Sequence, residues 1–122
     1  PFNQKIEAQK IHDKYKIQTE GWAPFAEGKH GIFENEILRS IAAKYDKSVA
    51  QVILRWHIQR NIVVIPKSVK RERMIQNFAV FDFELSGQDM EAIKSLDTGT
   101  TAFFDHRDPE WVESLSTRKL DI

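Results

Sequence analysis

The most restrictive feature of this sequence is a short β-branched run, IVVI at residues 62–65, which ends at Pro66. Such a run favours a strand that is buried on both faces, as in parallel sheets. One other segment, residues 17–23, favours a strand and stops before Pro24. Two strands do not complete a parallel sheet, because each buried strand needs neighbours on both edges and helices on both faces. The sequence therefore predicts that further strands come from elsewhere.

Helical patterns surround these two strands. Apolar residues recur at helical spacing, or helix-start signals occur, at residues 4–15, 34–45, 48–60 with Ser48 as cap, 71–78, 86–96 with a capping-box-like pair Ser86 and Asp89, and after Pro109. Residues 26–33 contain two glycines and no period, which predicts a loop. This alternation predicts an α/β fold with parallel strands.

A (β/α)₈ barrel needs about 250 residues, and this chain has 122. The chain would supply the last two barrel strands with their helices, followed by a C-terminal tail at residues 97–122 that could form a substrate loop. It opens on Pro1 and enters a helical pattern almost at once, which suggests that it begins partway through a longer protein. We therefore expect residues 1–122 to form a single incomplete domain.

Composition excludes several classes of function. The 18 Lys and Arg residues balance the 18 Asp and Glu residues, which argues against binding nucleic acid or membranes through bulk positive charge. The chain has no cysteine, so it has no thiolate nucleophile and no cysteine-ligated metal. A reducing cytoplasm fits this composition. No apolar run approaches the roughly 18 residues of a membrane span, so we expect a soluble protein.

A basic cluster follows the second strand. Four positive charges and one negative charge lie between Lys67 and Arg73, in a neutral chain. The start of the next helix adds free backbone N–H groups and the positive end of the helix dipole, and Ser68 adds a hydroxyl. Phosphate sites of (β/α)₈ barrels commonly lie here. Arg73, Gln76 and Asn77 lie on one face of the helix, so one anionic ligand could contact all three.

Other interpretations of these residues stay open. The basic cluster could be a solvated loop, or a nucleic-acid site, although no aromatic residue interleaves it for stacking. Trp22 could stack on a flat ligand ring or pack in the core. The tail aromatics Phe103, Phe104 and Trp111 could pack together or wall a substrate pocket.

Catalytic and metal-binding patterns are not found. The four histidines form no HExxH motif, and no GxSxG motif surrounds the serine of the basic cluster. We assign no catalytic residue and no metal ligand.

Several segments, in order, resemble the C-terminal portion of the aldo-keto reductase family. They are GWAPF at 21–25, AQVILRW at 50–56, VIPKS at 64–68 with Arg73 and Asn77-Phe78, and VFDFELS at 80–86 with Asp89-Met90. Members of this family are (β/α)₈ barrels that bind NADP(H) and reduce aldehydes and ketones to alcohols. The resemblance therefore implies an NADPH-dependent oxidoreductase with a small-molecule carbonyl substrate.

The resemblance also implies roles for individual residues. Trp22 matches the residue that stacks on the nicotinamide ring, with Ala23 and Phe25 along the same cofactor wall. Lys67, Ser68 and Val69 match the loop around the adenosine 2′-phosphate, Arg73 matches the arginine that pairs with it, and Gln76 and Asn77 match the positions that hold the adenine edge. NADPH is favoured over NADH, which lacks the 2′-phosphate. The chain departs from the family at Gln76, where Glu is frequent, and at Lys70 and Arg71, where a small residue and Pro are frequent.

The family's catalytic Asp, Tyr, Lys and His belong to its N-terminal half, and no matching motif occurs in this chain. The chain alone is therefore expected to be inactive, with the other half of the barrel or a second copy as its partner. No nucleic-acid or membrane partner is expected. An alternative hypothesis is a non-enzymatic binding or assembly module that pairs through exposed strand edges.

Overall fold

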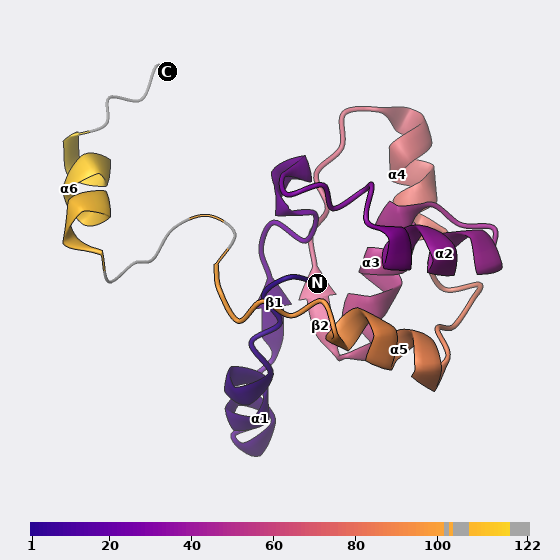
Figure 1. Ribbon diagram of the computed structural model, residues 1–122, viewed down its shortest axis with the longest axis horizontal. Helices are drawn as coiled ribbons and strands as arrows, with labels where there is room; N and C mark the ends of the chain where they lie inside the picture. Colours follow the sequence, from indigo (N-terminus) through magenta and orange to yellow (C-terminus); the bar gives the residue numbers. More distant parts are fainter. Residues whose placement is uncertain (102, 104–107, 118–122) are drawn as a thin grey trace.

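The computed structural model describes residues 1–101, 103 and 108–117. In chain order the elements are α1 (Ile6–Lys14), β1 (Thr19–Gly21), the 3₁₀ helix η1 (Ala26–Gly28), α2 (Glu36–Lys44), α3 (Val49–Gln59), β2 (Ile62–Val64), α4 (Arg71–Phe78), α5 (Gly87–Lys94) and α6 (Pro109–Thr117). The predicted helices are confirmed, and both strands occur but are shorter than predicted. Figure 1 shows α2 to α5 gathered on one side of the two strands, with α1 beside β1 and α6 apart.

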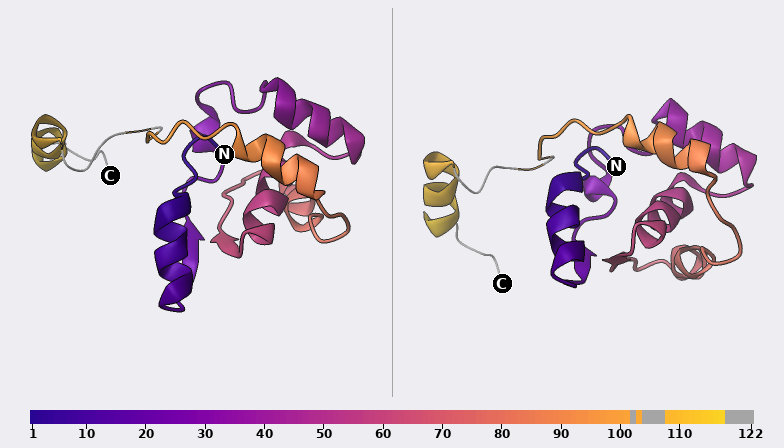
Figure 2. Two further views of the ribbon diagram at one scale, coloured as in Figure 1. Left: turned by 60° about the horizontal axis from the view of Figure 1, so that its bottom comes forward. Right: turned by 90° about the horizontal axis from the view of Figure 1, so that it is seen from below.

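The two strands are adjacent and parallel, as predicted. Thr19 pairs with Ile62, and Gly21 pairs with Val64. The connection between them carries η1, α2 and α3, and the turned views in Figure 2 show this crossover from two further sides. Because the strands are parallel, both reach their carboxyl ends at the same edge of the sheet. The segments that follow Gly21 and Val64 therefore begin side by side.

The prediction that residues 62–65 are buried on both faces is wrong. Ile62 is buried, but Val63 is 42% exposed and Ile65, beyond the strand, is 76% exposed. Among the described residues, β1 is the neighbour of β2 on one edge only. The face of the sheet that carries Ile62 lies against α3. A Cβ atom added at Gly21 on this face would lie 3.4 Å from the Ile62 side chain of β2 and 3.6 Å from the His57 side chain of α3. In the part of the chain that the structure describes, the opposite face and the outer edge of β2 are open.

The apolar stripe of α1 is only partly covered, with Ile6 and Ala8 half-buried. No residue of α1 is buried, and Ile11 is 56% exposed. Amphipathic spacing predicts which residues share a face, whereas burial requires an element that packs against that face.

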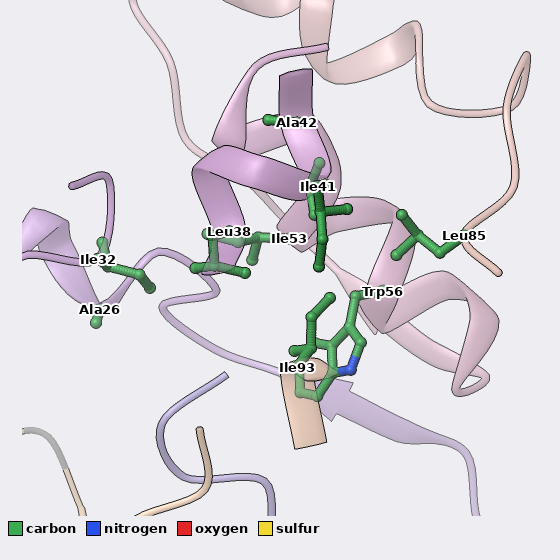
Figure 3. Packing of buried hydrophobic residues seen from close by; sticks show 10 residues of the cluster. Ala26, Ile32, Leu38, Ile41, Ala42, Ile53, Trp56, Leu85 and Ile93 are labelled. Atoms are coloured by element: carbon green, nitrogen blue, oxygen red, sulfur yellow. The ribbon is translucent and has the colours of Figure 1, made fainter. Parts of the chain in front are cut away.

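The core lies where α2, α3 and α5 meet. Leu38 and Ile41 of α2, Ile53 and Trp56 of α3, and Ile93 of α5 are each at most 5% exposed. Figure 3 shows these side chains converging from the three helices. Burial of one such side chain stabilises the fold by roughly 1.5–3 kcal/mol. This core holds α3 in place behind the sheet.

Both predicted helix caps are present. The Ser48 side chain accepts a hydrogen bond from the Gln51 backbone N–H (3.3 Å), and the Gln51 side chain accepts one from the Ser48 backbone N–H (3.0 Å). Ser86 and Asp89 form the same reciprocal pair at the start of α5. Each cap satisfies backbone donors that the first turn of a helix leaves unpaired.

Asp89 also joins α5 to α2. Its carboxylate accepts hydrogen bonds from the Tyr45 hydroxyl (2.5 Å) and from the Lys44 ammonium (2.9 Å). Asp89 is only 7% exposed. Burial raises the pKa of Asp89, but the hydrogen bonds from Tyr45, Ser86 and Lys44 outweigh it and hold the pKa well below its usual range. The carboxylate therefore stays ionised in mild acid.

Replacement of Ser48 by alanine removes the cap of α3 and is expected to lower the free energy of unfolding by about 1 kcal/mol. Urea unfolding followed by circular dichroism measures this difference. Ser40 is the matched control, because it is an exposed serine on α2; its change to alanine should stay within about 0.5 kcal/mol of the parent. Equal effects of the two changes would contradict the capping role.

Candidate functional site

The candidate site begins at the shared carboxyl edge of the two strands. Trp22 follows β1 directly, and the loop at residues 65–70 leads from β2 into α4. All the residues with predicted cofactor contacts lie on these two segments or on α4. Ligands of parallel α/β sheets bind outside the carboxyl ends of the strands. The fold thus brings two segments together that are far apart in the sequence.

The basic loop presents unpaired cations at a helix start. Ser68 Oγ accepts a hydrogen bond from the Lys70 N–H (3.1 Å) and lies 3.2 Å from the Lys70 carbonyl, to which it donates. Lys70 caps α4 without a side-chain hydrogen bond to the helix. Within the described part of the chain, no carboxylate pairs with Lys67, Lys70, Arg71 or Arg73. Free N–H groups, the helix dipole and these cations together favour an anion.

The other predicted residues of this segment differ in burial. Val69 is 85% exposed and Gln76 is exposed, whereas Asn77 is partly buried. Ser68 and Asn77 line a cavity of about 620 Å³, together with apolar residues of β2 and α4.

The first segment forms the wall of a second cavity, of about 720 Å³. Trp22 and Ala23 line it, and α3 contributes His57 and Arg60. Trp22 is 68% exposed, so the alternative that it packs in the core is wrong. Phe25 is not among the lining residues; its ring packs against Phe33 at a centroid distance of 5.9 Å.

Trp22 stacks on a residue of the C-terminal tail. The Trp22 and Phe103 ring centroids are 5.0 Å apart, with an angle of 29° between the planes. The Lys29 ammonium lies 5.2 Å from the centroid of the Phe103 ring. Phe103 was predicted to pack with Phe104 and Trp111 or to wall a substrate pocket, but nothing in the sequence signals that it contacts Trp22. Trp111 lies on α6, and Phe104 lies outside the described residues.

His57 has a structural environment. It is 8% exposed, its Nδ1 lies 2.8 Å from the Ile53 carbonyl, and its ring meets the Trp56 indole edge-on at 4.6 Å. Burial, with smaller contributions from the positive charges of the N-terminal amine and the Arg60 guanidinium, lowers the pKa of His57 to about 4, although the hydrogen bond to the Ile53 carbonyl acts in the opposite direction. The imidazole is therefore neutral at neutral pH, as a histidine packed inside the fold should be.

Among the described residues, no group of three His, Asp or Glu side chains could hold a metal ion. No helix among them is long and apolar enough to span a membrane.

The chain was compared with known proteins. The model of the Aldo/keto reductase family matches residues 5–98. Aldose reductase C of Dictyostelium discoideum is 48% identical over 96 residues, which cover 79% of this chain and 30% of that protein. Methylglyoxal reductase DkgA of Salmonella typhimurium is 42% identical over 99 residues, which cover 81% of this chain and 36% of that protein. The chain spans about a third of the length of the curated relatives it matches.

The same likeness holds in three dimensions. The crystal structure of a mutant of Gox0644 in complex with NADPH matches with a TM-score of 0.76 and 38% sequence identity, over 81% of this chain and 36% of that chain. Neighbours of this kind imply a fold of the (β/α)₈ barrel class. The resemblance noted in the sequence is confirmed, and the chain belongs to the aldo/keto reductase family.

Proposed function

We propose that this chain is the C-terminal part of an NADPH-dependent aldo-keto reductase that reduces aldehydes or ketones to alcohols. The observation that carries the proposal is the shared carboxyl edge, from which both the Trp22 segment and the basic loop leave. Two findings on related proteins support it: one structural neighbour holds NADPH, and relatives are named methylglyoxal and glyoxal reductases. The substrate class is therefore a small carbonyl compound.

The basic loop and α4 form the proposed adenosine-phosphate site. Lys67, Ser68 and Val69 would surround the 2′-phosphate, and Arg73 would pair with it, because a planar guanidinium suits phosphate recognition. Gln76 and Asn77 hold the edge of the adenine. Among the described residues, no carboxylate pairs with Lys67 or Arg73. This supports their proposed roles, because a phosphate could bind them without displacing a carboxylate.

Trp22 forms the proposed nicotinamide platform. Its indole is exposed at the end of β1 and lines the larger cavity, as a stacking surface requires. Ala23 lines the same cavity. Phe25, which does not line it, would support this wall through its packing against Phe33. When bound, NADPH would supply the hydride; this chain would orient the nicotinamide ring that carries it.

The rest of the barrel is the proposed partner of the open sheet. No described residue pairs with the outer edge of β2, and nearby apolar residues are between 42% and 81% exposed: Val63, Ile65, Phe78 and Phe81. Further strands and helices of a barrel would cover such residues. In this proposal they also carry the catalytic residues, so residues 1–122 form one incomplete domain that is inactive alone, with residues 97–122 as the tail beside the substrate.

A parallel titration of the purified chain with NADPH and with NADH tests the proposed site. Quenching of tryptophan fluorescence and energy transfer to the reduced nicotinamide report binding. We expect saturable binding with a clear preference for NADPH, because only NADPH carries the 2′-phosphate. Equal affinity for the two cofactors, or binding of neither, would contradict a 2′-phosphate site built by this chain.

A second candidate function is an assembly module that pairs through the same open edge. The exposure of Val63 on β2 favours it, because an uncovered strand is a template for another strand. In that case size-exclusion chromatography would show a species of twice 14.2 kDa.

The change of Val63 to lysine tests whether such a dimer pairs through the edge of β2. A charged lysine on the exposed strand should raise the dissociation constant of such a dimer by about tenfold or more. The change of Ile11 to lysine is the matched control, because Ile11 is a similarly exposed apolar residue on α1. A dimer that both variants leave intact would not use the edge of β2.

A further inference from the structure

The segment that follows α5 is tied to the N-terminal segment. Gln4 is only 5% exposed, and its side-chain amide donates a hydrogen bond to the Ile93 carbonyl (2.8 Å) near the end of α5. The Gln4 backbone N–H donates to Asp97 Oδ1 (3.1 Å), and the Thr98 backbone N–H donates to the Phe2 carbonyl (2.8 Å). Figure 1 shows this segment running from α5 past the N-terminus toward β1. Its course is therefore set by hydrogen bonds before it reaches the site.

Residues 99–101 then line the larger cavity beside Trp22. Phe103, two residues further on, stacks on the Trp22 ring at 5.0 Å. Lys29, whose ammonium is paired with the Glu27 carboxylate at 2.8 Å, lies over the Phe103 ring at 5.2 Å. The tail aromatic is thus in contact with Trp22 and with the loop that follows β1.

Trp22 needs an external contact to hold one orientation. It lies beyond the last paired residue of β1, and it is followed by Ala23 in the left-handed region (φ 49°). Its side chain is 68% exposed, so the core does not confine it. An indole that is already ordered by a stacked ring loses less conformational freedom when a ligand binds.

We propose that residues 97–101 together with Phe103 act as a clasp and that Phe103 is a positioning residue, which fixes the Trp22 indole so that its open face meets the flat ring of a ligand. The identity of that ring as nicotinamide rests on the proposed function. The contact between Phe103 and Trp22 does not. The two parts of the proposal are therefore tested separately.

The first experiment uses the full chain without ligand, labelled with 5-fluorotryptophan and observed by ¹⁹F NMR. The Trp22 resonance is assigned with Trp22→Phe. We expect Phe103→Ala to shift the Trp22 resonance and to leave the Trp56 resonance in place, while Phe103→Tyr keeps both near the parent positions. Phe81→Ala is the matched control, because Phe81 is an exposed phenylalanine (71%) elsewhere. A Trp22 resonance that does not respond to Phe103→Ala would overturn the clasp.

The second experiment compares NADPH with 2′-phospho-ADP-ribose, which lacks the nicotinamide. We expect Phe103→Ala to weaken NADPH binding by about 2- to 12-fold, the range of one aromatic pair, and to leave the affinity for 2′-phospho-ADP-ribose unchanged. Phe103→Tyr should restore the affinity for NADPH.

Two outcomes of this experiment would overturn the positioning role. Tighter NADPH binding in Phe103→Ala would mean that Phe103 blocks the ring site, and equal weakening of both ligands would mean a general structural effect. If the parent chain binds neither ligand, the proposed function fails for this chain, and the ¹⁹F experiment alone still decides whether Phe103 orients Trp22.

Discussion

Replacement of Arg73 by alanine is expected to weaken NADPH binding by about 1.5–3 kcal/mol, the contribution of charge-assisted hydrogen bonds. This energy corresponds to an increase in Kd of about 10- to 150-fold. NADH binding should change little, because NADH has no 2′-phosphate for the guanidinium to meet. Fluorescence titration of the variant with both cofactors measures the two changes in one preparation.

Two further variants make this prediction specific. Arg73→Lys keeps the charge but loses the bidentate geometry, so its affinity for NADPH should lie between those of the parent and Arg73→Ala. Arg39→Ala removes a positive charge from an exposed position on α2 and should leave both affinities unchanged. If Arg73→Ala weakened NADH as much as NADPH, or if Arg39→Ala had the same effect, Arg73 would not be the partner of the 2′-phosphate.

Acidification from pH 6.5 to pH 4 is expected to lower the free energy of unfolding by about 3 kcal/mol through His57. The pKa of His57 falls from 6.5 to about 4 on folding, because burial disfavours the charged imidazole. Between these two values the unfolded chain binds a proton that the folded chain does not. Stability is therefore complete above pH 6.5, declines as the pH falls, and loses no more through this group below pH 4.

The ionised network of Asp89 should persist through this window, because its pKa lies well below the usual range for a carboxyl group. Urea unfolding at several pH values gives the slope. His57→Asn removes the titration while retaining a donor for the Ile53 carbonyl, and should flatten the slope between pH 6.5 and pH 4.

The ¹H NMR titration of the His57 ring in the parent chain checks the assignment without a variant. A midpoint near 6.5 would show that His57 is not responsible.

The interpretation of local elements from sequence was accurate because their signals span only a few residues. Ser48 and Ser86 cap their helices through residues three positions further on, and the stripe that contains Val52, Ile53 and Trp56 repeats at the helical period. The parallel pairing of the strands also followed, because β-branched strands separated by helices favour it. These features depend on interactions that the sequence itself places within reach.

Burial of β2 and the environment of Trp22 depend on segments far away in the chain. Val63 is exposed because a second neighbouring strand is not among the described residues, although its sequence favours burial. Spacing alone suited Trp22 to either a core or a ligand platform; the structure leaves its indole 68% exposed and stacks it on Phe103.

The sequence by itself determined the helices with their caps, the two strands, and the unusual concentration of positive charge at the start of α4. Only the tertiary structure decided that the Trp22 segment and the basic loop both begin at the same edge of the sheet, and that Phe103 stacks on Trp22. The physical reason is the sequence separation between the interacting residues. Helical periods and caps depend on residues three or four positions apart. The candidate site depends on the crossover between the strands and on contacts with the tail, which no local sequence pattern predicts.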